Sequence, residues 1–188
     1  MQAHPDGRCG RLSAFAASSS NRSQGNPAMG STRRLSNAAS FLHHYLDYDT
    51  YTGSDVWRLI GGSLDDTYGP DSPGGTQNSC AARASYALNR CGCAIPRGTA
   101  GANRNWNGDD KRYILSARQM NAYLRKAYGP PARTLQDAVQ LGLLRHELGE
   151  DGVAIVSSTG HVAVVTGTYA DRYVAHYLGD VWIFATVQ

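Results

Sequence analysis

The sequence changes from loop to helix within the stretch Gln77-Asn78-Ser79-Cys80-Ala81-Ala82-Arg83-Ala84-Ser85-Tyr86-Ala87-Leu88-Asn89. The loop that leads into it, residues 69–79, is rich in glycine and proline, whereas good helix formers follow from Cys80 with apolar residues at helical spacing. Asn78 or Ser79 can accept hydrogen bonds from the first free amides of that helix. Cys80 is therefore predicted to lie in the first helical turn, where free N–H groups and the positive end of the helix dipole favour the nucleophilic thiolate.

A candidate base for this thiol lies in the C-terminal part of the chain. Residues 152–156 are predicted to form a short buried strand, residues 157–160 a tight turn, and residues 161–166 a second strand that begins with His161. Taken alone, a cysteine of this kind is more often a small buried residue, and such a histidine is more often a surface residue. Together, however, the two contexts favour a nucleophile and base of the kind found in papain-like peptidases and cell-wall amidases.

Several segments resemble the fourth family of amidase effectors of bacterial type VI secretion. The resemblance covers about residues 40–188, and its most specific part is the string Asn-x-Cys-Ala-x-Arg-x-Ser-Tyr-x-Leu-Asn at residues 78–89. The other matching segments are Val56-Trp57-Arg58-Leu59-Ile60-Gly61-Gly62, Ile95-Pro96, Tyr113-Ile114 through Met120, Tyr123-Leu124, Tyr128-Gly129-Pro130 and Gly160-His161.

This resemblance implies an α+β, papain-like (NlpC-type) cysteine amidase, with N-terminal helices packed on an antiparallel β-sheet. Such an enzyme is a DL-endopeptidase that hydrolyses the γ-D-glutamyl–meso-diaminopimelate amide of peptidoglycan stem peptides. At the matching positions, Cys80 is the nucleophile and His161 is the base. The aspartate that orients the histidine falls at or near Asp171, which we expect to precede a strand over residues 172–174, and Asp180 is the rival position.

The residues around Cys80 suggest how the developing oxyanion is held. The backbone N–H of Cys80 supplies one donor, and either Gln77 or Asn78 supplies the second. Arg83 follows on the same helix, and the resemblance suggests a structural ion pair as readily as a contact with a substrate carboxylate.

Composition and charge exclude several classes of protein. The chain has 188 residues and a net charge of +3, and its Lys and Arg residues are scattered, so nucleic-acid binding is not indicated. No segment is long and apolar enough for a membrane-embedded protein, and no signal peptide is evident. With the resemblance, this implies synthesis in a donor cytoplasm and delivery by the type VI secretion machinery, independently of a signal peptide, into the periplasm of a rival cell. A cognate periplasmic immunity protein is the implied partner.

The chain is predicted to divide into residues 1–35, a disordered N-terminal segment, and residues 36–188, a single amidase domain. Within that domain, residues 117–128 should form an amphipathic helix, and a short helix capped by Thr134 should follow over residues 134–139. Strands over residues 173–177 and 181–185 should complete the antiparallel sheet.

The remaining cysteines and histidines give no prediction of a metal or cofactor. Cys91 and Cys93 are expected to be free and buried behind the helix, although either could pair with Cys9 in an oxidising periplasm. The adjacent His43 and His44 point to different faces of a helix, so a metal site is not expected there.

Two other classes of function share these residues. A different Cys–His enzyme, such as a cell-wall endopeptidase of another specificity or an acyl transferase, would use the same Cys80 and His161. A catalytically inactive binding module would keep the fold without the chemistry.

Overall fold

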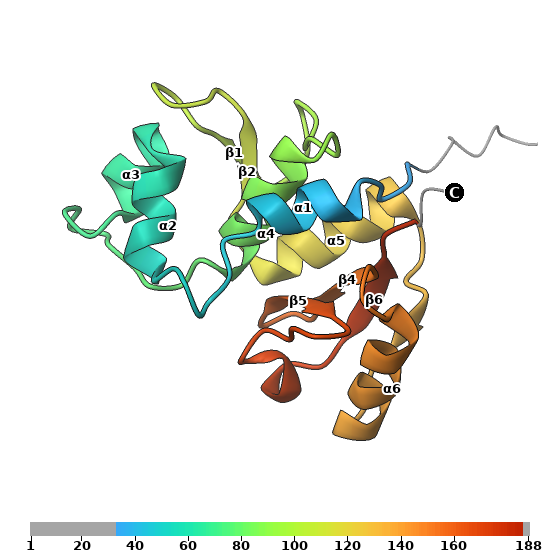
Figure 1. Cartoon of the computed structure of the whole chain (residues 1–188). Coiled ribbons are helices and arrows are strands. Elements are labelled where there is room, and N and C mark those ends of the chain that lie inside the picture. Colours follow the sequence, from blue (N-terminus) through green and yellow to red (C-terminus); the bar gives the residue numbers. More distant parts are fainter. Residues whose placement is uncertain (1–32, 186–188) are drawn as a thin grey trace, which may run out of the picture. The chain divides into compact units, whose positions relative to one another are not determined.

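Residues 33–185 of the protein are described by a computed structural model, shown in Figure 1. Cys9 and residues 1–32 of the predicted N-terminal segment lie outside the described residues. In chain order, the elements are α1 (Ala38–His44), α2 (Gly53–Ile60), α3 (Gly62–Tyr68), α4 (Cys80–Arg90), β1 (Ala102–Arg104), β2 (Arg112–Ile114), α5 (Ala117–Tyr128), β3 (Arg133–Thr134), α6 (Ala138–Leu148), β4 (Val153–Ser157), β5 (Val162–Thr166), the 3-10 helix η1 (Val174–His176) and β6 (Asp180–Ile183).

An antiparallel sheet with the strand order β3-β6-β4-β5 forms the C-terminal half. Strands β4 and β5 are the predicted hairpin, and they pair from Val153 opposite Thr166 to Ser157 opposite Val162. Every residue of both strands is buried. Hydrophobic residues therefore occupy both faces of these strands, as expected for a sheet that is covered on both sides.

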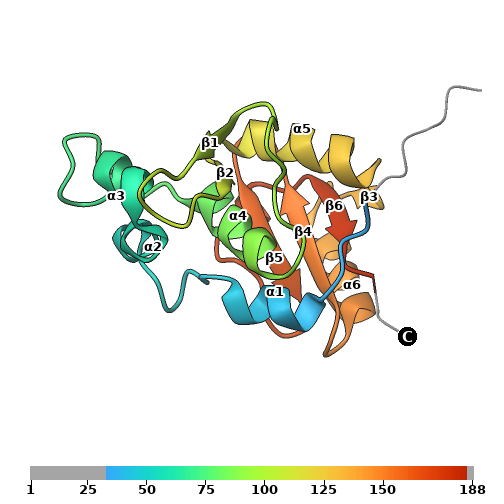
Figure 2. The same ribbon diagram turned by 90° about the horizontal axis from the view of Figure 1, so that it is seen from above.

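Helices cover the two faces of this sheet (Figures 1 and 2). Val153 and Ile155 of β4 pack in a core with α1, α4 and α5, whereas Ala154 and Val156 pack in a second core with α6. Because successive side chains of a strand point to opposite faces, one strand serves both cores. The predicted arrangement of N-terminal helices on an antiparallel sheet is therefore present.

Helix α4 contacts α1, α2, α5, β2 and β5, and all but two of its eleven residues are buried. In the core that α4 shares with α1, α5 and the sheet, most of its side chains are small, namely Cys80, Ala81, Ala84 and Ala87 beside Leu88, so its backbone can approach its neighbours closely. The helix ends at Arg90, and Gly92 follows the C-cap with a φ of 90°, a left-handed conformation that glycine adopts without strain. Cys80 is thereby fixed at the N-terminal end of a rigid, buried helix.

The strand predicted over residues 173–177 is wrong, because this segment contains the 3-10 helix η1. The carboxylate of Asp171 accepts the backbone N–H of Tyr173 at 2.9 Å, and the carbonyl of Asp171 accepts that of Val174 at 3.0 Å. These local bonds turn the chain away from the sheet after the single bridge between Val165 and Ala170. Asp171 consequently lies in a turn at the start of this segment.

The helix predicted over residues 134–139 is also displaced. Thr134 belongs to β3, where its hydroxyl donates to Asp180 at 2.7 Å. Asp137 caps α6, since its side chain accepts the N–H of Gln140 at 2.8 Å. The predicted cap, Thr134, is used instead in the pairing of β3 with β6.

No helix among residues 33–185 combines the length and the apolar character that crossing a membrane would require.

Candidate active site

Cys80 begins α4, as predicted, and its side chain is buried. Ser79, the residue before the helix, makes no capping bond with its side chain. Its hydroxyl instead accepts the Nε–H of Arg83 at 3.1 Å. The predicted capping by Ser79 is therefore wrong, and the first-turn amides around Cys80 are left without this acceptor, which suits them to stabilise negative charge.

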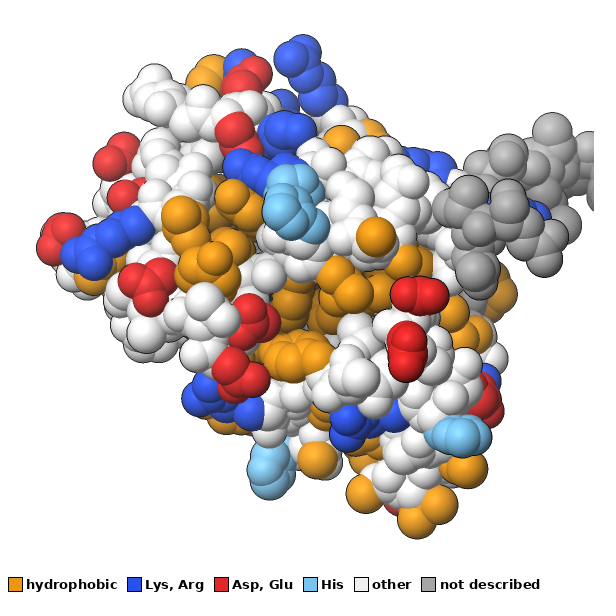
Figure 3. All heavy atoms as spheres, in the orientation of Figure 1, with side chains coloured by type: hydrophobic (Ala, Val, Ile, Leu, Met, Phe, Trp, Pro, Cys, Tyr) orange, Lys and Arg blue, Asp and Glu red, His pale blue; other side chains and the backbone are white. Residues whose placement is uncertain are grey.

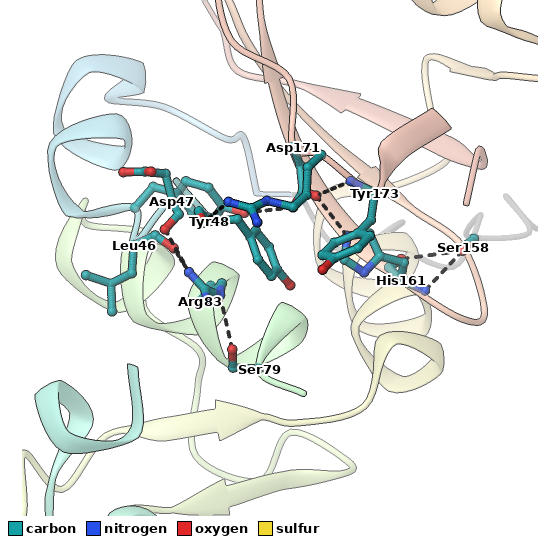
Figure 4. Close-up of polar contacts among 11 residues, drawn as sticks. Leu46, Asp47, Tyr48, Ser79, Arg83, Ser158, His161, Asp171 and Tyr173 are labelled. Atoms are coloured by element: carbon teal, nitrogen blue, oxygen red, sulfur yellow. Dashed lines mark hydrogen bonds and ion pairs between the residues drawn. The ribbon is translucent and has the colours of Figure 1, made fainter. Parts of the chain in front are cut away.

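His161 and Asp171 form a buried pair (Figure 4). His161 also interacts with Cys80, although the two are far apart in sequence. Nε2 of His161 lies 3.3 Å from Oδ1 of Asp171, and the two side chains are 8% and 0% exposed. The other carboxylate oxygen accepts the hydroxyl of Tyr45 at 3.4 Å. Because an imidazole directs its two nitrogens to opposite sides, binding of Nε2 by Asp171 leaves Nδ1 for Cys80.

The surroundings of His161 favour its protonated form. Burial lowers the pKa of the ring, but hydrogen bonds to Asp171 and Cys80 and the negative charge of both groups outweigh burial and raise the pKa to about 9. Protonation of His161 therefore stabilises the fold fully below the ordinary pKa of 6.5, and this contribution is lost as the pH rises through about 9. At neutral pH the site can hold an imidazolium beside the thiol.

Asp180 lies in a different environment. It belongs to β6, where it forms an ion pair with Arg125 and accepts a hydrogen bond from Asn121 at 3.0 Å. The sequence left two candidates for the aspartate that orients His161. In the structure, Asp171, and not Asp180, contacts His161.

A cleft of about 500 Å³ opens beside His161. Figure 3 shows a hollow with hydrophobic side chains around it on the face seen in Figure 1. The lining residues are Tyr48, Tyr51, Thr52, Gly53, Gln77, Asn78, Arg83, Gly160, His161, Arg172, Tyr173 and Tyr177. The cleft therefore combines aromatic rings, backbone and two arginines around the catalytic candidates, and none of these lining residues is acidic.

Three tyrosines surround His161 and were not predicted. The ring centroids of Tyr48, Tyr173 and Tyr177 lie 6.0, 5.8 and 5.4 Å from that of His161. They come from two separate segments that carry no motif. Only the folding of the segment before α2 onto the turn after β5 brings them to one site.

Arg83 does not form the structural ion pair that the resemblance suggested as one of two roles. Its side chain is buried, and no ion pair with it occurs within residues 33–185. The guanidinium donates to the carbonyl of Leu46 and, at 2.9 and 2.8 Å, to those of Asp47 and Tyr51. It also lies 3.8 Å from the centroid of the Tyr48 ring (Figure 4). Arg83 thus fastens residues 46–51, one wall of the cleft, to the catalytic helix.

Gln77 and Asn78 both line the cleft and are exposed, as a role near the nucleophile requires. The side-chain amide of Gln77 donates to Ser54 Oγ at 2.7 Å. This bond ties Gln77 to α2. The choice between these two residues as an oxyanion donor stays a prediction.

Cys91 and Cys93 are free and buried, as expected. The proposed pairing of either with Cys9 concerns a residue outside the described range. Within residues 33–185, no group of three or more His, Cys, Asp or Glu side chains is arranged to hold a metal ion, and this includes the surroundings of His43 and His44.

The sequence from residue 76 to 184, more than half of the chain, matches the model of the family described as type VI secretion system amidase effector protein 4. The chain belongs to this family. The protein is therefore an antibacterial amidase effector that degrades peptidoglycan. Among curated proteins, no relative matches.

Solved structures of this family share the fold. The effector of the Tae4–Tai4 effector–immunity complex from Salmonella Typhimurium is 24% identical, with a TM-score of 0.59 over 81% of this chain and 100% of that one. The effector Tae4 from Enterobacter cloacae is 21% identical, with a TM-score of 0.59 over 84% and 99%. The predicted α+β, papain-like fold of the NlpC type is thereby confirmed.

Proposed function

We propose that this amidase effector is a cysteine amidase in which Cys80 is the nucleophile, His161 the base and Asp171 the residue that orients the ring. The observation that carries the proposal is the position of His161, which a buried carboxylate holds at 3.3 Å and which lies close enough to Cys80, at the start of α4, for the thiol to help raise the pKa of the ring. A nucleophile, a base and an orienting group in this order are the parts of a catalytic triad.

The reaction begins when the thiolate of Cys80 attacks the scissile carbonyl. The backbone N–H of Cys80 and a side-chain amide of Gln77 or Asn78 stabilise the oxyanion, and one such donor contributes about 3 kcal/mol. Imidazolium His161 then gives its proton to the leaving amine, and a thioester to Cys80 remains. Neutral His161 next accepts a proton from water, which attacks the thioester, releases the acid and regenerates the thiol.

The proposed bond is the γ-D-glutamyl–meso-diaminopimelate amide of peptidoglycan stem peptides. Stem peptides carry several carboxylates, and the charged side chains that line the cleft, Arg83, Arg172 and His161, are all basic. The tyrosines supply flat surface for the aliphatic parts of such a peptide. The cleft is complementary to this substrate in both charge and surface.

We further propose that the protein acts in the periplasm of a target cell after delivery by the type VI secretion machinery. Related structures from Salmonella and Enterobacter are complexes of an effector with its immunity protein. A cognate immunity protein of this chain would protect sibling cells by covering the cleft that His161 lines. Its binding would then compete with the substrate.

Mass spectrometry of purified peptidoglycan from a Gram-negative bacterium, digested with the full chain, tests the function. We expect products that end in a free γ-carboxyl of D-glutamate and products that begin with the free amine of meso-diaminopimelate. Cleavage of another bond would indicate a Cys–His hydrolase of different specificity. Intact peptidoglycan would indicate a binding module.

The pH dependence of hydrolysis tests the role of Asp171. If imidazolium His161 protonates the leaving amine, kcat/KM falls at alkaline pH as the ring loses its proton near its pKa of about 9. Asp171→Asn removes the charge that raises this pKa, so the alkaline limb of the profile moves to lower pH. Asp180→Asn is the matched control, and its profile keeps the wild-type limb. If the alkaline limb moved with Asp180→Asn but not with Asp171→Asn, Asp180 would be the residue that orients His161.

A further inference from the structure

Arg172 differs from the other arginine of the cleft in how its charge is used. The guanidinium of Arg83 is buried and held by three backbone carbonyls and a hydroxyl. Arg172 forms an ion pair with Asp49, with 3.0 Å between a guanidinium nitrogen and Oδ1. The side chains are 49% and 70% exposed, respectively. Exposed ion pairs contribute little stability, so Arg172 can exchange this partner for a ligand carboxylate at little cost.

The position of Arg172 favours one part of the substrate. It follows Asp171, the residue that holds His161 Nε2, and it lines the cleft with Tyr173 and Tyr177. A guanidinium Nη of Arg172 also donates to the carbonyl of Tyr48, whose ring lies 6.0 Å from that of His161. Arg172 is therefore anchored near the ring that gives its proton to the leaving amine.

The leaving amine of the proposed reaction belongs to meso-diaminopimelate. At the far end of its side chain, this residue carries a second carboxylate, which lysine, the equivalent residue of other stem peptides, lacks. Arginine binds carboxylates through two parallel hydrogen bonds, so a guanidinium on this side of the cleft distinguishes the two residues. We propose that Arg172 binds the side-chain carboxylate of meso-diaminopimelate and sets the preference for this residue over lysine.

This inference depends on the proposed function, and its test compares two synthetic peptides, L-Ala-γ-D-Glu-meso-diaminopimelate-D-Ala and L-Ala-γ-D-Glu-L-Lys-D-Ala. We expect the full chain to prefer the first peptide. Arg172→Gln should reduce kcat/KM for the diaminopimelate peptide roughly 10- to 100-fold, chiefly through KM, because a charged hydrogen-bonding partner is lost. The reduction for the lysine peptide should be several-fold smaller, so the ratio of the two values falls towards one.

Arg125→Gln is the matched control, because Arg125 also forms an ion pair with an aspartate but does not line the cleft. It should leave the preference unchanged. Arg172→Lys keeps the charge without the planar fork and should retain part of the preference. Titration of both peptides into the Cys80→Ser chain, with and without Arg172→Gln, measures the same difference as binding, without turnover.

The outcomes separate this inference from the proposed function. A chain that cleaves neither peptide, or cleaves another bond, overturns both. A chain that cleaves the Glu–diaminopimelate amide without preference, or keeps its preference in folded Arg172→Gln, overturns the inference alone. If Arg172→Gln does not fold, Arg172→Lys provides the test. A preference for the diaminopimelate peptide equal to that of the wild type would show that the planar guanidinium does not recognise the carboxylate.

Discussion

Replacement of Cys80 by serine is expected to reduce peptidoglycan hydrolysis by roughly a thousandfold or more, because a hydroxyl is a far poorer nucleophile than a thiolate at neutral pH. The change is nearly isosteric, so the melting temperature should stay close to that of the wild type. Release of diaminopimelate-terminated products measures the loss. The same substitution should remove the lysis that the wild-type chain causes when it is directed to the periplasm of a Gram-negative host, whereas cytoplasmic expression of the wild type should be tolerated.

Cys91→Ala is the control for this experiment. Cys91 is another buried, free thiol, at the other end of α4, where its Sγ donates to the carbonyl of Leu88 at 3.6 Å. Its variant should therefore keep hydrolysis and toxicity. Wild-type activity in Cys80→Ser would contradict the cysteine mechanism. Equal toxicity of the wild-type chain in the cytoplasm and the periplasm would contradict the periplasmic action.

Arg83→Met is expected to have the largest effect on stability, a loss of about 3 kcal/mol in the free energy of unfolding. Methionine fills much of the space but donates no hydrogen bonds. The carbonyls of Leu46, Asp47 and Tyr51 and the hydroxyl of Ser79 would lose their buried donor. Because these groups fasten a wall of the cleft to α4, kcat/KM should fall as well.

Urea unfolding measures this change as a lower midpoint with an unchanged slope. Arg118→Met is the matched control, since Arg118 is exposed on α5 and should change the stability by less than about 0.5 kcal/mol. Equal stability of the two variants would show that the bonds of Arg83 do not hold residues 46–51 in place.

Local sequence was sufficient for the elements that carry the nucleophile and the base. The glycine-rich loop followed by helix formers placed Cys80 at the start of α4, and two apolar runs around a tight turn placed His161 beside β5. Both features depend on neighbours in the chain, so propensity and periodicity are adequate guides. The same guides failed for residues 173–177, where an apolar alternation looked like a strand but the hydrogen bonds of Asp171 formed a turn.

The sequence by itself determined the helix that begins at Cys80, the β4–β5 hairpin and the family to which these motifs belong. Only the tertiary structure decided that Asp171, not Asp180, contacts His161, that Arg83 binds backbone carbonyls, and that three tyrosines surround the site. The physical reason is that these contacts join residues far apart in the sequence. The bond of Tyr45 to Asp171 joins residues 126 positions apart and that of Arg172 to Asp49 joins residues 123 apart. Such pairs form only after the helices have packed on the sheet, and neither partner carries a local signal of the other.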